Sequence, residues 1–331
     1  MRRTILAILG AMLIHASPAR GQSLTAEGDV TTGYSTDQVA AVATQLRAFG
    51  DLKAGVRFYV EAAWARRSEK ETDAFAAAYP YGGRLDVIEA YAERLFTPGR
   101  TLVGIRAGRY RTPFGISNRS DHAYAGFIRA PLIRYDDYYA LSNTFLEHGA
   151  DLIVGVPQLY LETSLGVPAD VGDEKRRSGL NRVFRVQGYH GSWIVGVSHI
   201  RTRPNQPASF ARGWAEFTGI DARWTRDGLL ARGEWITGQP FDGTTTDGWY
   251  VDLMLHRVAM GPVTAVLRAE RLNYDAAAMF ALAATRVTAG AKVRLPRGLT
   301  AQINLLRQSG GLPRYRPIPV DLALTYSIRL D

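Results

Sequence analysis

The sequence has no cysteine, only four lysines in 331 residues, and no long apolar run after its first twenty residues. The lack of cysteine excludes a small scaffold held together by disulfides. A membrane-spanning helix needs roughly 18 or more consecutive apolar residues, and no later stretch approaches that length. Disulfide-rich modules and helical membrane proteins are therefore both excluded.

The first residues have the pattern of a secretory signal. Arg2 and Arg3 precede an apolar run at 5–14, which is too short to cross a bilayer as a helix. Ala19 and Gly21 place small residues at the two positions that signal peptidase reads. We therefore expect residues 1–21 to be a signal peptide and residues 22–331 to form one domain.

Charge gives a second limit on function. The formal charge is +9, and removing the three arginines of the signal leaves 37 basic and 31 acidic residues, a balance of +6. The basic residues are spread along the chain and not gathered in one patch, which argues against a nucleic-acid partner. Most of them are arginines, whose rigid fork of donors stays charged in partly dehydrated places.

From residue 24 onward the apolar residues recur with a period of two. In the stretch 52–64 the apolar residues fall on one face, and Arg57, Tyr59 and Glu61 fall on the other. A strand separates residues in this way, whereas a helix scatters them around its circumference. Sixteen such segments are expected, near 24–35, 39–49, 52–66, 84–96, 101–111, 146–155, 158–167, 181–191, 192–203, 212–226, 228–238, 247–259, 262–274, 282–295, 298–308 and 317–330. The segments 84–96 and 101–111 alternate less well, which predicts bulges in both.

The connections between these segments alternate in length. One set consists of short turns rich in Gly, Pro and Asp, such as those at 50–51, 191–192 and 226–228. The other set is mostly longer, at 67–83, 112–145, 168–180, 204–211, 239–246, 275–281 and 309–316. Short turns at one end and long loops at the other are typical of outer-membrane barrels. The fold class predicted is therefore all-β, a closed antiparallel transmembrane barrel of about sixteen strands.

A soluble β protein also alternates, so the two possibilities must be separated. The polar faces carry charges along whole strands, and a ring of sixteen long strands is too wide for side chains to fill, so its interior should be wet. The tryptophans lie near strand ends or on apolar faces, as in interfacial girdles. These features favour a bacterial outer-membrane location. The alternatives are a barrel that binds without conducting and a soluble, β-rich secreted enzyme.

If the N-terminus is periplasmic, the connection 112–145 is the third outer loop and the longest. Its beginning, Gly108-Arg109-Tyr110-Arg111-Thr112-Pro113-Phe114-Gly115, resembles the strand-to-loop transition of bacterial outer-membrane porins of the phosphate-selective, anion-type family. The layout of strands extends the resemblance over the whole mature chain. The resemblance implies passive diffusion of small hydrophilic solutes with a mild anion preference, phosphate being one candidate. It also implies a third loop that folds inward, a homotrimer, outer-membrane lipid around the barrel, and insertion by the barrel assembly machinery.

The resemblance and the alternation together give candidate pore residues. For the constriction they are Arg109, Arg111, Arg119, Asp121, Arg129, Arg134, Asp136, Asp137 and Glu147. For the wall they are Arg57, Arg106, Arg185, Arg223, Arg232, Arg268, Arg286, Lys292, Arg294 and Arg329, together with the acids Glu61, Glu162, Asp221, Glu234, Asp252, Glu270 and Asp321. Two interpretations stay open: a net basic constriction that filters anions, or solvated charges neutralised in pairs. One departure from the family is the C-terminus, which ends Leu330-Asp331 where such barrels commonly place an aromatic residue.

No catalytic or metal motif is found. The histidines that remain after the signal show no metal-ligand spacing, and we expect no cofactor. Ser198 and His199 are adjacent in one strand, so they should point to opposite faces and cannot form a nucleophile–base pair. Glu147 and His148 are expected to form a charge pair at the rim. The chain is therefore predicted not to be an enzyme.

Overall fold

The computed structural model describes residues 23–52, 55–69, 73–75, 82–116, 126–134, 146–169, 179–202, 214–240, 243–256, 261–276, 281–311 and 318–330. These residues form sixteen strands: β1 (Ser23–Ser35), β2 (Val39–Asp51), β3 (Val56–Arg67), β4 (Gly82–Phe96), β5 (Leu102–Arg111), β6 (Leu146–Val156), β7 (Leu159–Ala169), β8 (Asn181–His190), β9 (Trp193–Thr202), β10 (Ala215–Arg226), β11 (Leu229–Gln239), β12 (Thr245–His256), β13 (Val263–Asp275), β14 (Ala281–Arg294), β15 (Leu299–Gly310) and β16 (Val320–Leu330). Among the described residues, no helix is long and apolar enough to cross a membrane.

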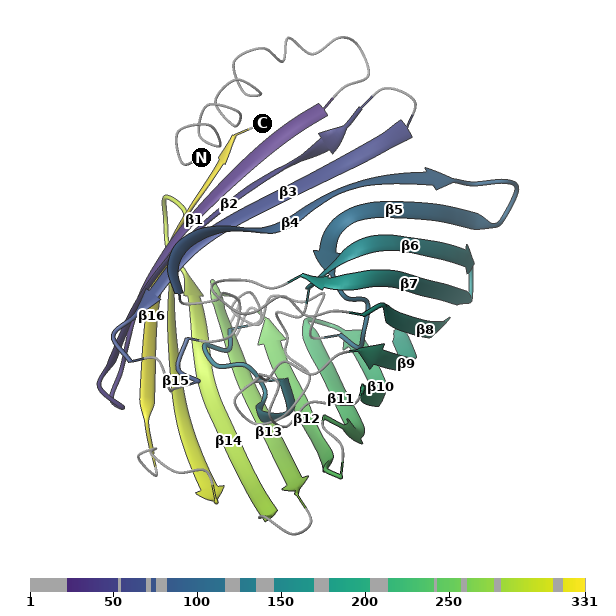
Figure 1. Ribbon diagram of the computed structural model, residues 1–331. Helices are drawn as coiled ribbons and strands as arrows, with labels where there is room; N and C mark the ends of the chain where they lie inside the picture. The colour runs from purple at the N-terminus through teal and green to yellow at the C-terminus, as the bar shows by residue number, and fades with distance from the viewer. Residues whose placement is uncertain are drawn as a thin grey trace.

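Every strand pairs antiparallel with its neighbours in the sequence, and β1 pairs with β16 to close the ring (Figure 1). The closing pair runs from Ala26 opposite Leu330 to Ser35 opposite Asp321. Closure gives every strand a hydrogen-bonded neighbour on each side, as hydrocarbon surroundings would require. The prediction of a closed antiparallel barrel of sixteen strands is confirmed.

The strand bounds follow the alternation closely, with one clear difference at β3. This strand begins at Val56, whereas the sequence pattern begins at Leu52. The amide of Leu52 donates to the carbonyl of Val56 at 2.7 Å, and Gly55 has φ +70°. The alternating pattern therefore begins before the strand does, and Gly55, in the left-handed region, directly precedes β3.

The bulge expected in 84–96 is present, and the one expected in 101–111 is not. Glu61 pairs with Glu89 and Ala62 with Val87, so Ile88 is an extra residue in β4. In β5 the register is unbroken on both sides, so that prediction is wrong. The weak alternation of β5 has another cause: two of its positions are glycines, Gly104 and Gly108, and these carry no side chain to show a face.

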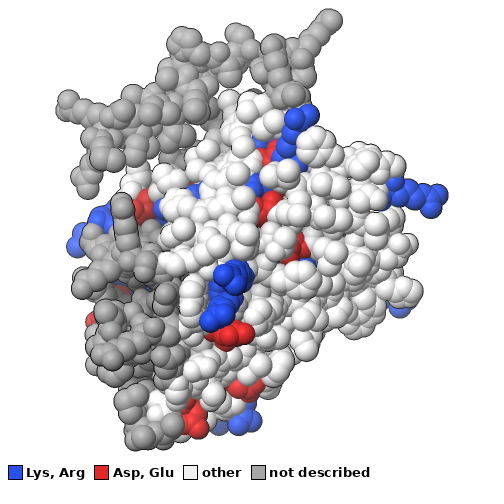
Figure 2. Space-filling model, turned by 45° about the vertical axis from the view of Figure 1, so that its right-hand side comes forward, with Lys and Arg blue, Asp and Glu red and all other residues white. Residues whose placement is uncertain are grey.

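The two faces of the barrel differ sharply in polarity. Val251 and Leu253 of β12 are 45% and 40% exposed, while Asp252 between them is fully buried. The same contrast holds for Ile303 and Asn304 of β15. Figure 2 shows a side of the molecule on which the described surface is largely uncharged. An exposed apolar surface of this extent needs a non-aqueous covering.

Tryptophans are part of this outer face. Trp193 and Trp224 oppose each other on β9 and β10, with ring centroids 6.1 Å apart, and Trp193 is 51% exposed. Trp235 and Trp249 oppose each other on β11 and β12 and are also exposed. Aromatic rings with one polar edge favour the boundary between lipid and water. Trp193 and Trp224 lie near the strand ends next to the short turn, as predicted for an interfacial girdle, whereas Trp235 and Trp249 lie nearer the middle of their strands on the apolar face.

Candidate pore and its inward-folded loop

The connection between β5 and β6 sends a segment into the barrel. Its described parts are residues 112–116 and 126–134, and the latter contains the short 3-10 helix η2 (Leu132–Arg134). In Figure 1 the described segment lies inside the ring, against the wall that includes β12 and β13. We call residues 126–134 the inner segment. Its contacts are with inward-facing side chains of the wall.

One end of the inner segment is held by an amide side chain of β15. The Ile128 amide donates to Oδ1 of Asn304 at 2.7 Å, and Nδ2 of Asn304 donates to the Gly126 carbonyl at 3.0 Å. Asn304 is 1% exposed, so both hydrogen bonds form away from water. A side-chain amide thus pairs with backbone groups that would otherwise be buried without partners.

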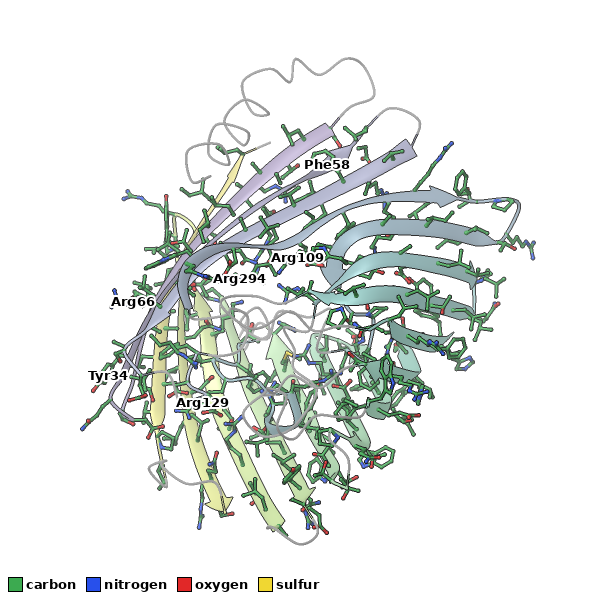
Figure 3. All side chains as sticks on the ribbon, viewed as in Figure 1. Tyr34, Phe58, Arg66, Arg109, Arg129 and Arg294 are labelled. Carbon is green, nitrogen blue, oxygen red and sulfur yellow. The ribbon has the colours of Figure 1, made fainter. Side chains whose placement is uncertain are left out.

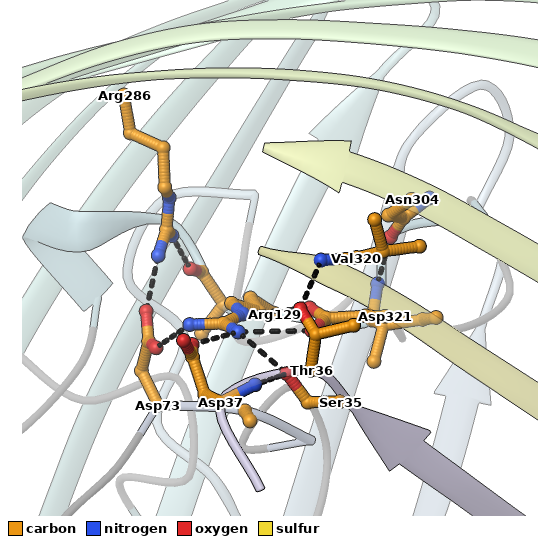
Figure 4. A network of polar contacts seen from close by, with 12 residues as sticks. Ser35, Thr36, Asp37, Asp73, Arg129, Arg286, Asn304, Val320 and Asp321 are labelled. Atoms are coloured by element: carbon orange, nitrogen blue, oxygen red, sulfur yellow. Dashed lines mark hydrogen bonds and ion pairs between the residues drawn. The ribbon is translucent and has the colours of Figure 1, made fainter. Parts of the chain in front are cut away.

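The centre of the inner segment is an arginine surrounded by carboxylates (Figure 4). Arg129 pairs with Asp37 at 2.8 Å, with Asp73 at 2.6 Å and with Asp321 at 2.6 Å. It also donates to the Ser35 hydroxyl at 3.1 Å. Figure 3 shows Arg129 inside the ring of strands. These partners come from the connection after β1, the connection after β3 and the last strand, so one side chain joins three distant parts of the chain.

Arg286 of β14 extends this network. It pairs with Asp73, and with Glu270 of β13 at 2.7 Å, and it donates to the Ala130 carbonyl at 2.6 Å. Burial alone would raise the pKa of Asp73, but the guanidiniums of Arg129 and Arg286 hold this pKa below its ordinary value of 3.8. The same carboxylates raise the pKa of Arg129 against the effect of its burial. Asp73 and Arg129 are therefore both charged at neutral pH.

We expect the barrel to lose stability in acid through Asp73. A carboxyl with a lowered folded-state pKa stabilises the folded protein fully above its unfolded pKa, and loses that contribution as pH falls through the lowered value. The unfolding temperature in detergent should therefore change little between pH 7 and about pH 5 and should fall below pH 3.8. The Asp73→Asn variant should have a lower unfolding temperature at pH 7, and that temperature should fall less in acid than the temperature of the unaltered protein. A loss of unfolding temperature that occurs mainly near pH 6 would contradict this prediction.

A second arginine of the wall also binds the inner segment. Arg268 of β13 pairs with Asp252 at 2.6 Å and donates to the Arg129 carbonyl at 3.0 Å. Its guanidinium lies 3.9 Å from the centre of the Phe127 ring. The neighbouring acid Glu270 accepts from the Leu132 amide at 2.6 Å. Wall charges thus satisfy the backbone of the segment as well as each other.

The far end of the inner segment is fixed to β11. Arg134 pairs with Glu234 at 2.5 Å and donates to the Phe114 carbonyl at 3.1 Å; both charged side chains are fully buried. Gly115 lies against this pair, and its amide donates to the Ser198 hydroxyl at 3.0 Å. A Cβ at Gly115 would lie 1.6 Å from Oε1 of Glu234, and φ there is +61°. The ion pair therefore requires glycine at this position.

The Gly115→Ala variant should lose the pair between Arg134 and Glu234. Separating a buried ion pair and placing a side chain in the left-handed region should together lower the free energy of unfolding by at least about 3 kcal/mol. Gly243 is the matched control, because its φ is +72° and nothing lies near its missing Cβ. Gly243→Ala should cost only about 1 kcal/mol. Equal losses of the two variants in urea unfolding would refute the requirement for glycine at position 115.

The described parts of the connection between β5 and β6 also carry an apolar surface. Phe114, Ile116, Leu132 and Ile133 form one buried cluster with inward side chains of the strands β8 to β14, namely Val183, Ile200, Ala215, Phe217, Ile236, Tyr250, Leu272 and Ala284. The expectation of charged inward faces along whole strands is therefore wrong for this part of the wall. The reason is that the loop, and not water, covers these strands.

The wall of β1 to β7 is different, since several of its charged groups remain partly exposed. Arg106 pairs with Glu93 at 2.8 Å and with Asp151 at 3.3 Å. Arg111 pairs with Glu61 at 2.9 Å and with Glu89 at 3.1 Å. The side chains of Arg106 and Arg111 keep 16% and 18% exposure. On β2, Arg47 lies between Glu27 and Asp29 in the same way.

An aromatic row crosses the same wall. Phe49, Tyr59 and Tyr91 oppose one another on β2, β3 and β4, with ring centroids 6.3 Å and 5.4 Å apart. Arg106 continues the row, with its guanidinium 5.0 Å from the Tyr91 ring centre. The Tyr59 hydroxyl donates to Glu61 at 2.8 Å. Cross-strand stacking of this kind stiffens a sheet and keeps the charged groups beside it in fixed positions.

Comparison with known proteins gives no match to a protein-family profile or to a curated protein sequence. Several solved structures are similar. Salmonella typhi OmpF in complex with daunomycin aligns with a TM-score of 0.65 and 9% identity, over 93% of this chain and 97% of its own. The anion-selective porin from Comamonas acidovorans gives 0.63 and 12% identity over 93% and 99%. The trimer form of OmpT, an outer membrane protein of Vibrio cholerae, gives 0.59 and 10% over 93% and 99%.

The chain has a porin-type fold. The identities are too low to carry more than the fold, so the solutes and partners of those proteins stay with those proteins. Nothing in the comparisons distinguishes the phosphate-selective family from other porins.

Most of the predicted arginines lie in ion pairs inside the porin-type barrel. Beyond those described above, Arg185 pairs with Asp221 at 2.7 Å and Arg232 with Asp252 at 2.9 Å, all with little or no exposure. Glu162 lies 3.6 Å from Arg106. These contacts agree with the pairing interpretation left open by the sequence.

Other predicted residues lie apart from this buried set. Arg57 and Arg329 are largely exposed and lie beside Asp51 and Glu27, respectively, near the end of the short turns. Arg109 donates to the Ile88 carbonyl at 3.1 Å. Arg223 and Lys292 are half-buried and Arg294 is exposed. Four of the predicted constriction residues, Arg119, Asp121, Asp136 and Asp137, and the predicted signal peptide lie outside the described residues.

The expectation for Glu147 and His148 was wrong. Glu147 is fully buried and accepts hydrogen bonds from Ser164 and from Asn181, the latter at 3.3 Å, while His148 is exposed. Adjacent strand residues point to opposite faces, so these two do not form a rim pair. The same rule confirms that Ser198 and His199 are separated: Ser198 is buried, and His199 contacts Glu216 on the outer side.

Several residues of the site were not found from the sequence. Asp37 and Asp73 lie in connections, and Asn304 is an uncharged residue of a regular strand. One signal was present: the long connection contains Phe127, Ile128, Leu132 and Ile133, and apolar residues in an outer loop predict that it is buried. In the described part of the chain, no group of three or more potential metal ligands is found.

Proposed function

We propose that the protein is an outer-membrane channel for passive diffusion of small hydrophilic solutes. The observation that carries this proposal is the asymmetry of the lumen. The inner segment is bound by buried pairs that include Asp321 of β16 and Glu234 of β11, whereas Arg106 and Arg111 on β5 keep partial exposure. A passage bounded by the loop on one side and by fixed charges on the other would select solutes by size and charge.

The outer-membrane location and the domain boundaries belong to the same proposal. The apolar outer face of the barrel is suited to lipid. Residues 1–21 would serve as the signal peptide and 22–331 as the barrel inserted by the assembly machinery. A homotrimer is proposed by analogy with the porin-type fold, since one similar structure is a trimer form.

We further propose a mild anion preference, with phosphate as one candidate solute. The mature balance of +6 and the partly exposed guanidiniums of Arg47, Arg106 and Arg111 support it. The preference should be small because each of these arginines also faces carboxylates. Reversal potentials across a planar bilayer under a potassium chloride gradient test it directly. A clear cation preference would overturn this part of the proposal and leave the channel intact.

One alternative has a specific observation in its favour. The apolar cluster between the loop and strands β8 to β14 fills part of the lumen, and a barrel filled completely would bind solutes without conducting them. Insertion of the purified protein into a planar bilayer distinguishes the two. Discrete conductance steps support the channel, and a folded, heat-modifiable barrel without any conductance supports the binding protein.

A further inference from the structure

Two arginines stand side by side on the outer face of the barrel. Arg182 of β8 lies directly opposite Arg201 of β9. Both are exposed, while the adjacent Val183 and Ile200 are buried, so both arginines point away from the lumen. Arg182 is the second residue of its strand and Arg201 the last but one of its own. The pair therefore lies at the barrel end that carries the long connections.

These two charges have no carboxylate partner among the residues that the structure describes. Glu216 of β10 is directly opposite Arg201, but its carboxylate contacts His199 at 3.3 Å. Like charges on directly opposed strand positions repel each other. Together with Glu216, the pair keeps a net positive charge on a surface that is otherwise largely apolar.

Its depth along the strand matches the boundary of a bilayer. From Trp193 to Arg201 is eight residues, which span about 26 Å along β9 and about 20 Å along the barrel axis at a usual tilt. Val195 and Val197, between these ends, are each 47% exposed. A ring of Trp214 lies 5.1 Å from the Arg201 guanidinium. Aromatic and basic side chains at the edge of an apolar band are typical of the headgroup level.

We propose that Arg182 and Arg201 together bind a phosphate group on the headgroup of an outer-leaflet lipid. Two neighbouring guanidiniums offer several N–H donors to the oxygens of one phosphate, and arginine is suited to this recognition. The apolar residues below the pair would contact the acyl chains of the same lipid. This inference depends on the proposed membrane placement and is independent of conduction.

The test uses the full chain purified in detergent and titrated with phosphatidic acid, with bound lipid counted by native mass spectrometry. The double variant Arg182→Gln/Arg201→Gln should bind more than tenfold more weakly, since each arginine near an anionic lipid contributes about fivefold. Each single variant should lose about fivefold. Arg307→Gln is the matched control: Arg307 is exposed on the outer face of β15, opposite Val287, with no second arginine across from it. It should lose less than either single variant.

Three results would overturn the proposal. The first is that the double variant binds phosphatidic acid as tightly as the unaltered protein. The second is that phosphatidylcholine binds as tightly as phosphatidic acid. The third is that inorganic phosphate at the same concentration binds as tightly as phosphatidic acid. The last would indicate a site for free phosphate. Conductance of the double variant should equal that of the unaltered protein, so loss of lipid binding and failure of the channel proposal are separate outcomes. Because both side chains are exposed, heat-modifiable migration should confirm that the variants fold.

Discussion

Replacing Arg129 by alanine should both destabilise the barrel and increase its conductance. The change removes the only arginine of the inner segment that contacts Asp37, Asp73 and Asp321 together, in the described part of the chain. Leaving buried carboxylates without their partner typically costs about 3–5 kcal/mol. The inner segment, no longer held at its centre, should leave the wall for part of the time and widen the passage.

The measurements are urea unfolding in detergent and single-channel conductance. Arg226→Ala is the control, because Arg226 pairs with Asp227 on the surface, where both side chains are largely exposed. Such a surface pair should contribute less than about 1 kcal/mol. If Arg129→Ala changes neither stability nor conductance more than the control does, the network does not hold the loop.

Placing an arginine in the middle of the outer face should strongly impair insertion of the barrel into lipid. Val251 lies near the middle of β12 and is 45% exposed. At the midplane of a bilayer, arginine on the lipid face of a barrel costs about 2–4 kcal/mol. Val251→Arg should therefore reduce the folded fraction recovered in lipid vesicles several-fold.

The matched control is Thr245→Arg, the first residue of the same strand and on the same outer face. Near the interface the cost falls to about 0–1 kcal/mol. In lipid vesicles, Val251→Arg should therefore give a lower folded fraction than Thr245→Arg. A soluble β protein would accept both exposed arginines equally, so equal recovery in vesicles would exclude a membrane barrel.

The strands were predictable because their signal is local. Alternation such as that of Val251, Asp252 and Leu253 can be recognised within a few residues, and each face of a barrel has a single environment along most of its length. The signal fails where the environment changes within one face. Phe217 and Ile236 are inward but apolar, because the loop covers them. No property of their own strands reveals that covering.

The partners of the arginines were not predictable for a different reason. Arg129 and Asp321 are separated by 192 residues, and Arg286 and Asp73 by 213. A residue type indicates that a partner is needed, since a buried guanidinium without one is very costly. It does not indicate which carboxylate is near, because that depends on the register of the closed ring and on the path of the connections. The sequence therefore predicts that these arginines pair with carboxylates, but it does not predict which carboxylate each arginine contacts.

The position of Arg129 also sets an order for folding. Its binding site consists of Asp37 after β1, Asp73 after β3 and Asp321 at the start of the last strand. This site does not exist until β16 has paired with β1, and contacts so distant in sequence form slowly because the chain must first lose the entropy of closing a long loop. Arg129 can therefore make all three of its ion pairs only after the ring has closed. The contacts with β11, β13 and β15 do not require that closure, so the centre of the segment should be the last part of it to become fixed.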